Sequence, residues 1–523
     1  MAERIRIGPL NRPAQGLDLE VTVDGGRVTD AVVSGTMARG LEVVLRDKDP
    51  RDAIVIAQRI CGVCPAPHSV ASAYAMDDIV GARVPGRARI TRNLILAAAH
   101  IGSHLTGFYL SSLQDYFDPT AAASYKGKDA RLRAVSTKMK RVLDSGEGAP
   151  FAPSFASPDL MRDPETSVLL LSHYLEALAM RRNADTMTAM IGGRHPHITS
   201  VVPGGVTVPV TQGQVTQFQL AAEELGDWIE SVMLPDAVAL ATGPMSPFAS
   251  GSFGSGTPNF LSFGLFDQGI SGDVKDRFLP SGAILAAKGG QAVPVVQELD
   301  PAKVTESLRF AWYKDAYDGR NPSEVITEFD SSKAEAYTFV KGPRYENRPM
   351  EVGPLARMLI RRDKGFQRLI ATAGVQPHSL PARMLSRAYE AQLVARKIPE
   401  WLDELVRATR EEERICDDKA FPGSGRSVGL IDGPRGALGH WVSLEGGRIA
   451  GYQVVSPSTW NASPRDGSFQ RGPIEEALIN TPVPDSNNPI NVVRVVRSFD
   501  PCLSCAVHLL DGKSRRVRVA QVW

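Results

Sequence analysis

The chain has 523 residues and a net charge of +1, and 43% of its residues are hydrophobic and 22% charged. These proportions are typical of an ordinary globular protein, and the length allows a large core with more than one structural layer. Because the net charge is close to zero, the sequence carries no electrostatic footprint for nucleic acid and no polybasic arm for a membrane surface. We therefore expect no nucleic-acid partner.

The N-terminal segment lacks the apolar stretch and the small-residue cleavage site of a signal peptide. The longest apolar stretch, at 94–110, is interrupted by His100, Gly102, Ser103, His104 and Thr106. A membrane helix needs about 20 nearly uninterrupted apolar residues, so this stretch is predicted to be a buried core helix and no transmembrane segment is expected. We expect a cytoplasmic protein that is exported or held at a membrane only through a partner chain.

In chain order, the first predicted element is a β-hairpin at residues 16–34, where apolar and polar residues alternate on either side of Asp24-Gly25-Gly26. A helix at 87–117 follows, apolar on nearly every face and therefore buried all round. Asp163 before Pro164 predicts the start of a helix that runs to about residue 190.

Two further long helices are predicted at 214–240 and 381–413, interrupted at Pro235 and Pro399. Residues 246–264 are rich in Gly, Ser and Phe and are expected to form an ordered surface loop, and residues 440–455 form a second hairpin around Gly446-Gly447. With no repeats and no clear linker, the pattern predicts one domain over 1–523. Its fold class is mainly α with small β additions, a large buried helical bundle with a β-hairpin near each end.

Four of the five cysteines form two Cys-x-x-Cys pairs, Cys61 with Cys64 and Cys502 with Cys505. Five cysteines are too few for a disulfide scaffold in a chain of this length. A Cys-x-x-Cys turn directs two thiolates to one side, so two such turns supply four soft sulfur ligands for a metal. The pattern predicts a soft-metal site that joins the two ends of the chain, without naming the metal.

Two other interpretations of the cysteine pairs are open at this point. A structural zinc site usually has its pairs within about 12–20 residues of each other, whereas nearly the whole chain separates these two. A thioredoxin-like redox pair needs a single motif in a βαβ context, which the sequence does not show.

The segments around these cysteines resemble the large subunit of nickel–iron hydrogenases, and the resemblance covers nearly the whole chain. The matched segments are Arg39-Gly40-Leu41-Glu42, Arg59-Ile60-Cys61-Gly62-Val63-Cys64, Gly192-Gly193-Arg194-His195-Pro196-His197, Glu351-Val352-Gly353-Pro354-Leu355-Ala356-Arg357, Gly433-Pro434-Arg435-Gly436-Ala437-Leu438-Gly439-His440-Trp441, Thr459-Trp460-Asn461 and the final Asp500-Pro501-Cys502-Leu503-Ser504-Cys505-Ala506-Val507-His508. The opening Gly8-Pro9-Leu10-Asn11-Arg12 resembles the cytoplasmic uptake and sensory branches of that family.

The resemblance implies a nickel ion held by Cys61, Cys64, Cys502 and Cys505. Cys64 and Cys505 would also bind an iron that carries one carbon monoxide and two cyanides, while Cys61 and Cys502 would bind nickel alone. It further implies that the Arg435 guanidinium lies over the open face of the two metals, with Asp500 as its acidic partner. A planar, permanently charged group suits this role because it can polarise hydrogen or steady a carboxylate.

Further roles follow from the same resemblance. The ring of Pro434 would contact the diatomic ligands of the iron. Glu42, the carbonyl of Val454 and His508 match a second metal site, generally magnesium, and the alternative for Glu42 is a buried ion pair with Arg39.

The other histidines and the fifth cysteine receive weaker assignments. His195 and His197 resemble residues near the exit for electrons, although a structural role in the core is nearly as well supported. His100, His104 and His440 are expected to be core histidines, and Cys416 a small buried hydrophobic residue.

The sequence departs from the family pattern on the proton route. Matching Arg12 to the family's N-terminal arginine puts Ala14 where a glutamate usually accepts a proton from a nickel-bound thiolate, and Ser103 replaces an aspartate beside the arginine. With Ala14 unable to titrate, we expect protons to leave through water or another carboxylate, and Glu20 on the first hairpin strand is the favoured candidate, with Cys502 as the first site of the proton.

The favoured function is therefore oxidation of H2 to two protons and two electrons. The electrons would pass to an iron–sulfur small subunit, because the paired cysteines of this chain are already used. Residues 509–523 follow His508 and are interpreted as a candidate propeptide, which implies a maturation endoprotease and nickel-insertion factors. The alternatives are a hydrogen sensor with slow turnover and the related quinone-site subunit of respiratory complex I, whose members lack the four cysteines.

Overall fold

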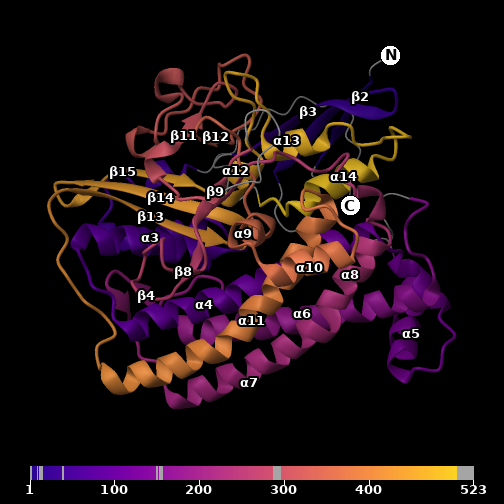
Figure 1. The fold of residues 1–523 in the computed structure, drawn as a ribbon, viewed down its shortest axis with the longest axis horizontal. Helices are drawn as coiled ribbons and strands as arrows, with labels where there is room; N and C mark the ends of the chain where they lie inside the picture. The colour runs from indigo at the N-terminus through magenta and orange to yellow at the C-terminus, as the bar shows by residue number, and fades with distance from the viewer. Residues whose placement is uncertain are drawn as a thin grey trace.

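A computed structural model describes residues 3–8, 10, 16–37, 40–148, 151, 157–286 and 296–502. Helices dominate the described residues, and the strands form small separate sheets (Figure 1). The predicted fold class, mainly α with small β additions, is confirmed.

Four long helices pack together and form the helical half of the molecule: α4 (Gly86–Leu105), α6 (Pro164–Gly192), α7 (Gln212–Trp228) and α11 (Leu380–Glu411) (Figure 1). Helix α4 is buried on nearly every side and continues through a π-helical turn (Thr106–Ser112) and a 3-10 turn (Leu113–Asp115). By length and composition alone, Gly86–Asp115 is apolar enough to cross a membrane, but 89% of its most apolar window is buried inside the protein. The predicted core helix is therefore confirmed.

The helix ends follow from local chemistry. Asp163 accepts a hydrogen bond from the backbone of Thr166 at the start of α6, as predicted, and Pro164 occupies the first turn. Pro235 lies in the first turn of α8 (Leu234–Thr242), which follows α7 after a π-helical turn (Ile229–Met233). The predicted interruption at Pro399 is wrong, because α11 runs through it, held on its buried face by the neighbouring helices.

Both predicted hairpins exist, and each gains a third strand. The first hairpin is β2 (Leu17–Asp24) with β3 (Arg27–Gly35), and β1 (Glu3–Ile7) pairs with β2. The second is β14 (Gly436–Glu445) with β15 (Arg448–Val455), and β13 (Gly425–Gly433) pairs with β14. The additional strands were not predicted.

Helix α3 (Pro65–Val80) covers the sheet β13–β14–β15 (Figure 1). The helix and the sheet approach so closely that a Cβ atom on Gly429 would lie 1.8 Å from the carbonyl oxygen of Ala71. This contact matters for the site, because α3 begins directly after Cys64 and β13 ends directly before Pro434.

Shorter elements complete the described part of the chain. The helices are α1 (Leu41–Val44), α2 (Ala53–Ala57), α5 (Ala130–Asp144), α9 (Pro354–Arg361), α10 (Lys364–Thr372), α12 (Pro457–Asn461), α13 (Pro473–Leu478) and α14 (Ile490–Ser498). The strands are β4 (Val201–Val202), β5 (Gly205–Val206), β6 (Phe260–Ser262), β7 (Leu265–Asp267), β8 (Arg277–Leu279), β9 (Gly282–Ile284), β10 (Val296–Gln297), β11 (Val304–Ser307) and β12 (Gly342–Tyr345). The predicted surface loop at 246–264 is wrong in its second half, because the aromatic and aliphatic side chains of β6 are buried in the core.

Candidate metal centre

Three cysteines from the two ends of the chain meet in the interior. Cys61 follows the 3-10 turn Gln58–Ile60, Cys64 caps the start of α3, and Cys502 follows α14. The sulfur of Cys61 lies 2.9 Å from that of Cys64 and 3.5 Å from that of Cys502. All three side chains are buried, and the fourth predicted ligand, Cys505, lies outside the described residues.

The separation of the Cys61 and Cys502 sulfurs fits a shared metal, whereas the 2.9 Å between the Cys61 and Cys64 sulfurs is shorter than two ligands of one metal require. Two sulfurs about 2.3 Å from one tetrahedral metal lie roughly 3.7 Å apart, close to the 3.5 Å that separates Cys61 and Cys502. The backbone N–H groups of Val63 and Cys64 donate to the Cys61 sulfur at 3.3 and 3.1 Å. Such donors, at the N-terminal end of a helix, favour a negatively charged sulfur, which is the form that binds metals.

Arg435 occupies the tip of a hairpin beside these sulfurs. Gly433 pairs with Gly436, so Pro434 and Arg435 are the two residues of the turn between β13 and β14. Gly436 has φ +124°, and a Cβ atom there would lie 2.5 Å from the backbone nitrogen of Gly353. The Gly-Pro-Arg-Gly motif is therefore a tight turn that only glycine can close against its neighbour.

The Arg435 guanidinium is fixed by Asp500 and Ser103. Nε donates to the carbonyl oxygen of Asp500 at 2.7 Å, Nη2 lies 3.0 Å from its carboxylate, and Nη1 donates to the Ser103 hydroxyl at 3.2 Å. Asp500 has φ +51°, a left-handed conformation that costs a residue with a side chain about 1 kcal/mol or more. This strained backbone conformation places both the carbonyl oxygen and the carboxylate of Asp500 against Arg435.

The electrostatics of this pair follow from burial and from the sulfurs. Burial alone would lower the pKa of Arg435, but Asp500 and the thiol groups of Cys502, Cys64 and Cys61 raise that pKa well above its ordinary value. Burial raises the pKa of the Asp500 carboxyl, although the Arg435 and Arg387 guanidinium groups oppose this. Arg435 is thus a permanent cation, and Asp500 is the carboxyl group beside the sulfurs that takes a proton more readily than usual.

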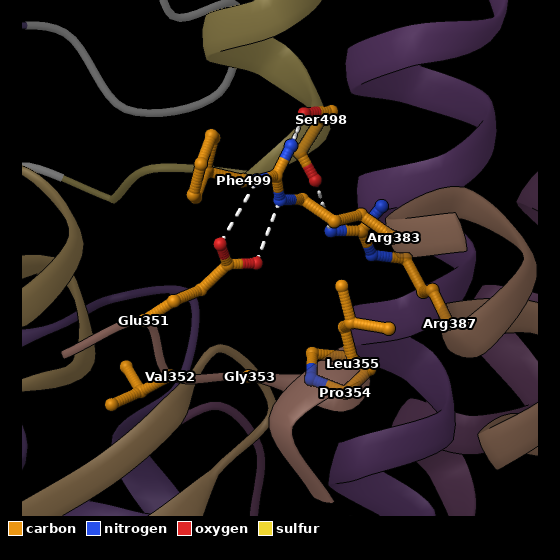
Figure 2. Close-up of a pocket in the computed structure, with 9 residues that line it drawn as sticks. All are labelled: Glu351, Val352, Gly353, Pro354, Leu355, Arg383, Arg387, Ser498 and Phe499. Carbon is orange, nitrogen blue, oxygen red and sulfur yellow. Dashed lines mark hydrogen bonds and ion pairs between the residues drawn. The ribbon is translucent and has the colours of Figure 1, made fainter. Parts of the chain in front are cut away.

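The surroundings of Asp500 are tightly packed. A Cβ atom on Gly107 would lie 2.7 Å from the Asp500 carboxylate and 3.3 Å from Nε of Arg387, so glycine allows both groups to approach the helix. Figure 2 shows Arg387 beside the ion pair of Glu351 with Arg383 and the segment Gly353–Leu355. The cavity that they line has a volume of about 10 Å³, enough for a single water molecule.

Two of the residues predicted to hold magnesium, Glu42 and Val454, lie together, while His508 and Arg39, the alternative ion-pair partner of Glu42, lie outside the described residues. The Glu42 carboxylate accepts from the Val454 N–H at 2.9 Å and from the Thr327 hydroxyl, and the ammonium group of Lys341 lies 3.2 Å from both of its oxygens. Lys341 is thus an ion-pair partner of Glu42 among the described residues, and it also donates to Gln453 at 2.7 Å.

A second carboxylate, that of Glu306, lies 3.4 Å from the ammonium group of Lys341. Burial raises the pKa of Glu306 to about 7, and one of its oxygens has no hydrogen-bond partner among the described residues. Among the described residues, two carboxylates face one lysine, and the raised pKa of Glu306 lets its carboxyl take up a proton near neutral pH. The side chains fit a cation, and sequence reasoning missed Lys341 and Glu306 because neither lies in a recognisable pattern.

The remaining predicted residues are placed as follows. His100 and His104 are buried and donate to Glu390, and His440 bonds to His68 and Tyr452, so all three are core histidines as predicted. His195 lies 3.1 Å from Asp185 and His197 lies 2.7 Å from Arg59, both partly exposed. Cys416 is only half-buried and contacts the Pro203 carbonyl at 3.4 Å, so its predicted burial is wrong.

Glu20 lies on the polar face of β2, where its carboxylate accepts from Arg6 of β1 at 2.7 Å and lies 3.6 Å from Arg4. Its side chain is 27% exposed. Ala14 and Arg12, which define the departure from the family pattern, lie outside the described residues. A role for Glu20 in proton transfer therefore stays a prediction, and it requires the ion pair with Arg6 to open.

Three buried thiols beneath a buried arginine, in a helix-dominated protein, define a metal–thiolate enzyme centre. A model of the nickel-dependent hydrogenase family matches residues 39–508. The chain is 35% identical over 542 residues to the periplasmic NiFeSe hydrogenase large subunit of Desulfomicrobium baculatum, covering 99% of this chain and 97% of that protein. It is 33% identical over 585 residues to the hydrogenase-1 large chain of Escherichia coli K12, with the same coverage.

The fold agrees with these relatives. A solved structure of H2-activated NiFeSe hydrogenase from Dm. baculatum superimposes with a TM-score of 0.84 and 35% identity, covering 97% of this chain and all of that one. The chain belongs to the nickel-dependent hydrogenase family. The predicted nickel–iron hydrogenase large subunit is thereby confirmed, and the zinc, thioredoxin-like and complex I alternatives are rejected.

Proposed function

We propose that this chain oxidises H2 heterolytically, to two protons and two electrons, beside Arg435, and that Arg435, Asp500 and Cys502 are its catalytic residues. The observation that supports this most strongly is the position of Arg435, which is held by Asp500 and Ser103 next to three buried cysteines. A buried cation at a fixed position can stabilise charge that develops as the H–H bond polarises, and it loses no proton itself.

Nickel would be held by Cys61, Cys64, Cys502 and Cys505, with Cys64 and Cys505 shared with an iron that carries one carbon monoxide and two cyanides. When bound, this group polarises H2 and accepts its electrons. The sulfur of Cys502 would hold the proton first. Asp500, which lies two residues before Cys502 and whose pKa is raised by burial, would receive it next. The ring of Pro434, in the same turn as Arg435, would face the diatomic ligands.

We further propose magnesium at Glu42, the Val454 carbonyl and His508, with Lys341 and Glu306 around it. The buried carboxyl groups of Glu42 and Glu306 support the assignment, because their oxygens are of the kind that magnesium binds. A cation there would tie the segment after Cys505 to α1, because His508 and Glu42 come from opposite ends of the sequence.

Electrons would leave to an iron–sulfur small subunit, since Cys416 is the one cysteine outside the two pairs and cannot ligate a cluster alone. A maturation endoprotease and nickel-insertion factors are proposed as transient partners. The cytoplasmic uptake or sensory branch stays a prediction, because one of the most similar relatives is named as periplasmic. A sensory role is the second candidate, and the departure at Ala14 is the one observation that favours it.

An infrared spectrum of the purified two-subunit enzyme tests the proposed centre. We expect one carbonyl band and two cyanide bands that shift when H2 replaces argon. A spectrum without these bands, in protein that oxidises H2, would contradict the proposed iron ligands. Steady turnover with an electron acceptor separates an enzyme from a sensor.

A further inference from the structure

A second arginine, Arg357 in α9, holds the turn that carries Arg435. Its guanidinium is completely buried, and all five of its N–H groups are used. Nε and Nη2 donate to the two oxygens of Glu390, both at 2.7 Å, and Nη1 donates to Asp432 at 2.8 Å.

The other two N–H groups reach the backbone immediately before Arg435. Nη1 donates to the carbonyl oxygen of Gly433 at 3.1 Å, and Nη2 donates to that of Pro434 at 3.0 Å. Both carbonyls belong to the hairpin turn, so their direction determines where the next side chain points. Among the described residues, the hydrogen-bond partners of Arg357 include no cysteine. Its contacts with the site are therefore those with the turn.

Arg357 is itself held from behind. The Glu390 oxygen that accepts from Nη2 also accepts from His100 at 2.6 Å and from His104 at 2.9 Å. Both histidines are buried and donate through Nε2 to the same oxygen. The Glu390 carboxylate is therefore held in place by α4 as well as by Arg357. His100, His104 and Glu390 lie close enough to hold a metal ion, but Arg357 already occupies both carboxylate oxygens, so we interpret the group as a hydrogen-bonded support.

Asp432 completes the support on the strand side. Its other oxygen accepts from the backbone of Phe263 at 2.8 Å, and its Oδ2 also accepts from Ser262 at 3.1 Å. The turn is thus connected through Arg357 to α11, α4 and β6. Lysine could not replace this arrangement, since it has three donors around one nitrogen and cannot span two carboxylates and two carbonyls.

We propose that Arg357 is a positioning residue for hydrogen activation: it sets the orientation of the Gly433–Gly436 turn, and thereby the place of the Arg435 guanidinium. This proposal rests on the proposed role of Arg435. A displacement of about 1 Å in a catalytic group can cost about 100-fold in rate, so loss of the two carbonyl contacts should lower turnover without removing the sulfur ligands.

The test compares Arg357→Lys with a matched control, Arg92→Lys, in the two-subunit enzyme. Arg92 is also fully buried, pairs with Asp77 at 2.6 Å, and donates to the carbonyls of Val202 and Gly205 at 2.8 and 3.1 Å. Asp77 lies 13 residues beyond Cys64 along α3, which corresponds to about 20 Å of helix. Both variants should lose comparable thermal stability.

We expect Arg357→Lys to lower kcat by about 10- to 100-fold, with nickel content retained and the KM for H2 nearly unchanged. Arg92→Lys should keep kcat within about threefold of the native value. The decisive reading is a double-mutant cycle with Arg435→Lys: if Arg357 acts through Arg435, adding Arg357→Lys to Arg435→Lys should cause little further loss of H2/D2 exchange.

Four outcomes would overturn the proposal. Equal kcat in the two arginine variants, or fully additive losses in the cycle, would show that Arg357 is merely structural while leaving the role of Arg435 intact. Near-normal turnover in Arg435→Lys alone would instead remove the proposed role of Arg435 and this inference with it. If Arg357→Lys does not incorporate nickel, Glu390→Gln, which keeps the side-chain volume and one acceptor oxygen, is put through the same cycle, and additivity there overturns the proposal.

Discussion

Arg435 is a residue whose position is determined by contacts with backbone and side chains from distant parts of the chain. Ser103 comes from α4, Asp500 follows α14, and the turn itself joins β13 to β14. Its motif identified the residue from the sequence, but the partners could not be assigned by spacing. Asp500 was matched through the family pattern, and Ser103 was noted only as a departure from it.

Replacing Arg435 by Lys should leave nickel content intact and lower H2 oxidation by about 100-fold or more. The physical reason is that one ammonium group cannot bond at once to the Asp500 carbonyl, its carboxylate and the Ser103 hydroxyl. The assay is kcat with an artificial electron acceptor, alongside nickel analysis of the same sample. Activity near the native level with full nickel would show that Arg435 is not catalytic.

Glu20→Gln tests the predicted proton route. If Glu20 carries protons, the variant should slow H2/D2 exchange strongly at unchanged nickel content, since glutamine has no acid–base function. Arg6→Gln, which frees the Glu20 carboxylate from its ion pair, serves as the control and should not slow exchange. Equal exchange in native protein and Glu20→Gln would assign Glu20 to the solvated face of the sheet. In that case, Ala14→Glu restores the family's residue. Faster H2/D2 exchange in this variant would show that the native chain limits the rate of proton transfer.

The elements show which parts of a sequence pattern predict structure. The hairpins at 17–35 and 436–455 were predicted because alternation and glycine turns are local signals, and α4 because it is apolar all round. Strand β1 alternates Arg4, Ile5, Arg6 and Ile7 and was detectable, whereas β13 contains several glycines and no regular alternation. The predicted interruption at Pro399 was wrong because packing against neighbouring helices maintains α11, although proline lacks a backbone N–H group.

Gly429→Ala tests the contact between the elements that carry the two halves of the site. A methyl group there would collide with the Ala71 carbonyl, and separating α3 from β13 would move Cys64 relative to Arg435. We expect a loss of about 3 kcal/mol in the free energy of unfolding, together with reduced nickel content. The measurement is thermal unfolding with metal analysis.

Gly213→Ala in α7 is the control for this variant, because the space around Gly213 is open and alanine favours a helix. It should leave stability unchanged or raise it slightly. If Gly429→Ala unfolds at the same temperature as Gly213→Ala, the close approach of α3 and β13 does not limit stability.

At the scale of the whole molecule, the two ends of the chain meet at one buried cluster of thiols. The sequence predicted this meeting from the Cys-x-x-Cys pairs, while the supports around it, such as Ser458 and Arg357, could not be predicted. Ser458 accepts from the backbone N–H of Cys502 at 2.9 Å, a contact that depends on the packing of α12 and leaves no mark in the sequence.

The segment 509–523 gives a prediction about maturation. If it is a propeptide, the measured mass of the active enzyme should correspond to a chain that ends at His508. The reason is that release of the segment would let His508 reach its metal. Mass spectrometry of protein that is active and nickel-loaded measures this directly. Full activity with an intact mass ending at Trp523 would overturn the processing hypothesis.

The central claim is that the four paired cysteines hold nickel and iron together, and elemental analysis of the purified enzyme tests it most directly. We predict about one nickel per chain and one iron beyond those of the partner's clusters, with nickel lost in Cys64→Ser. Stoichiometric zinc without nickel in native, active protein would contradict the account.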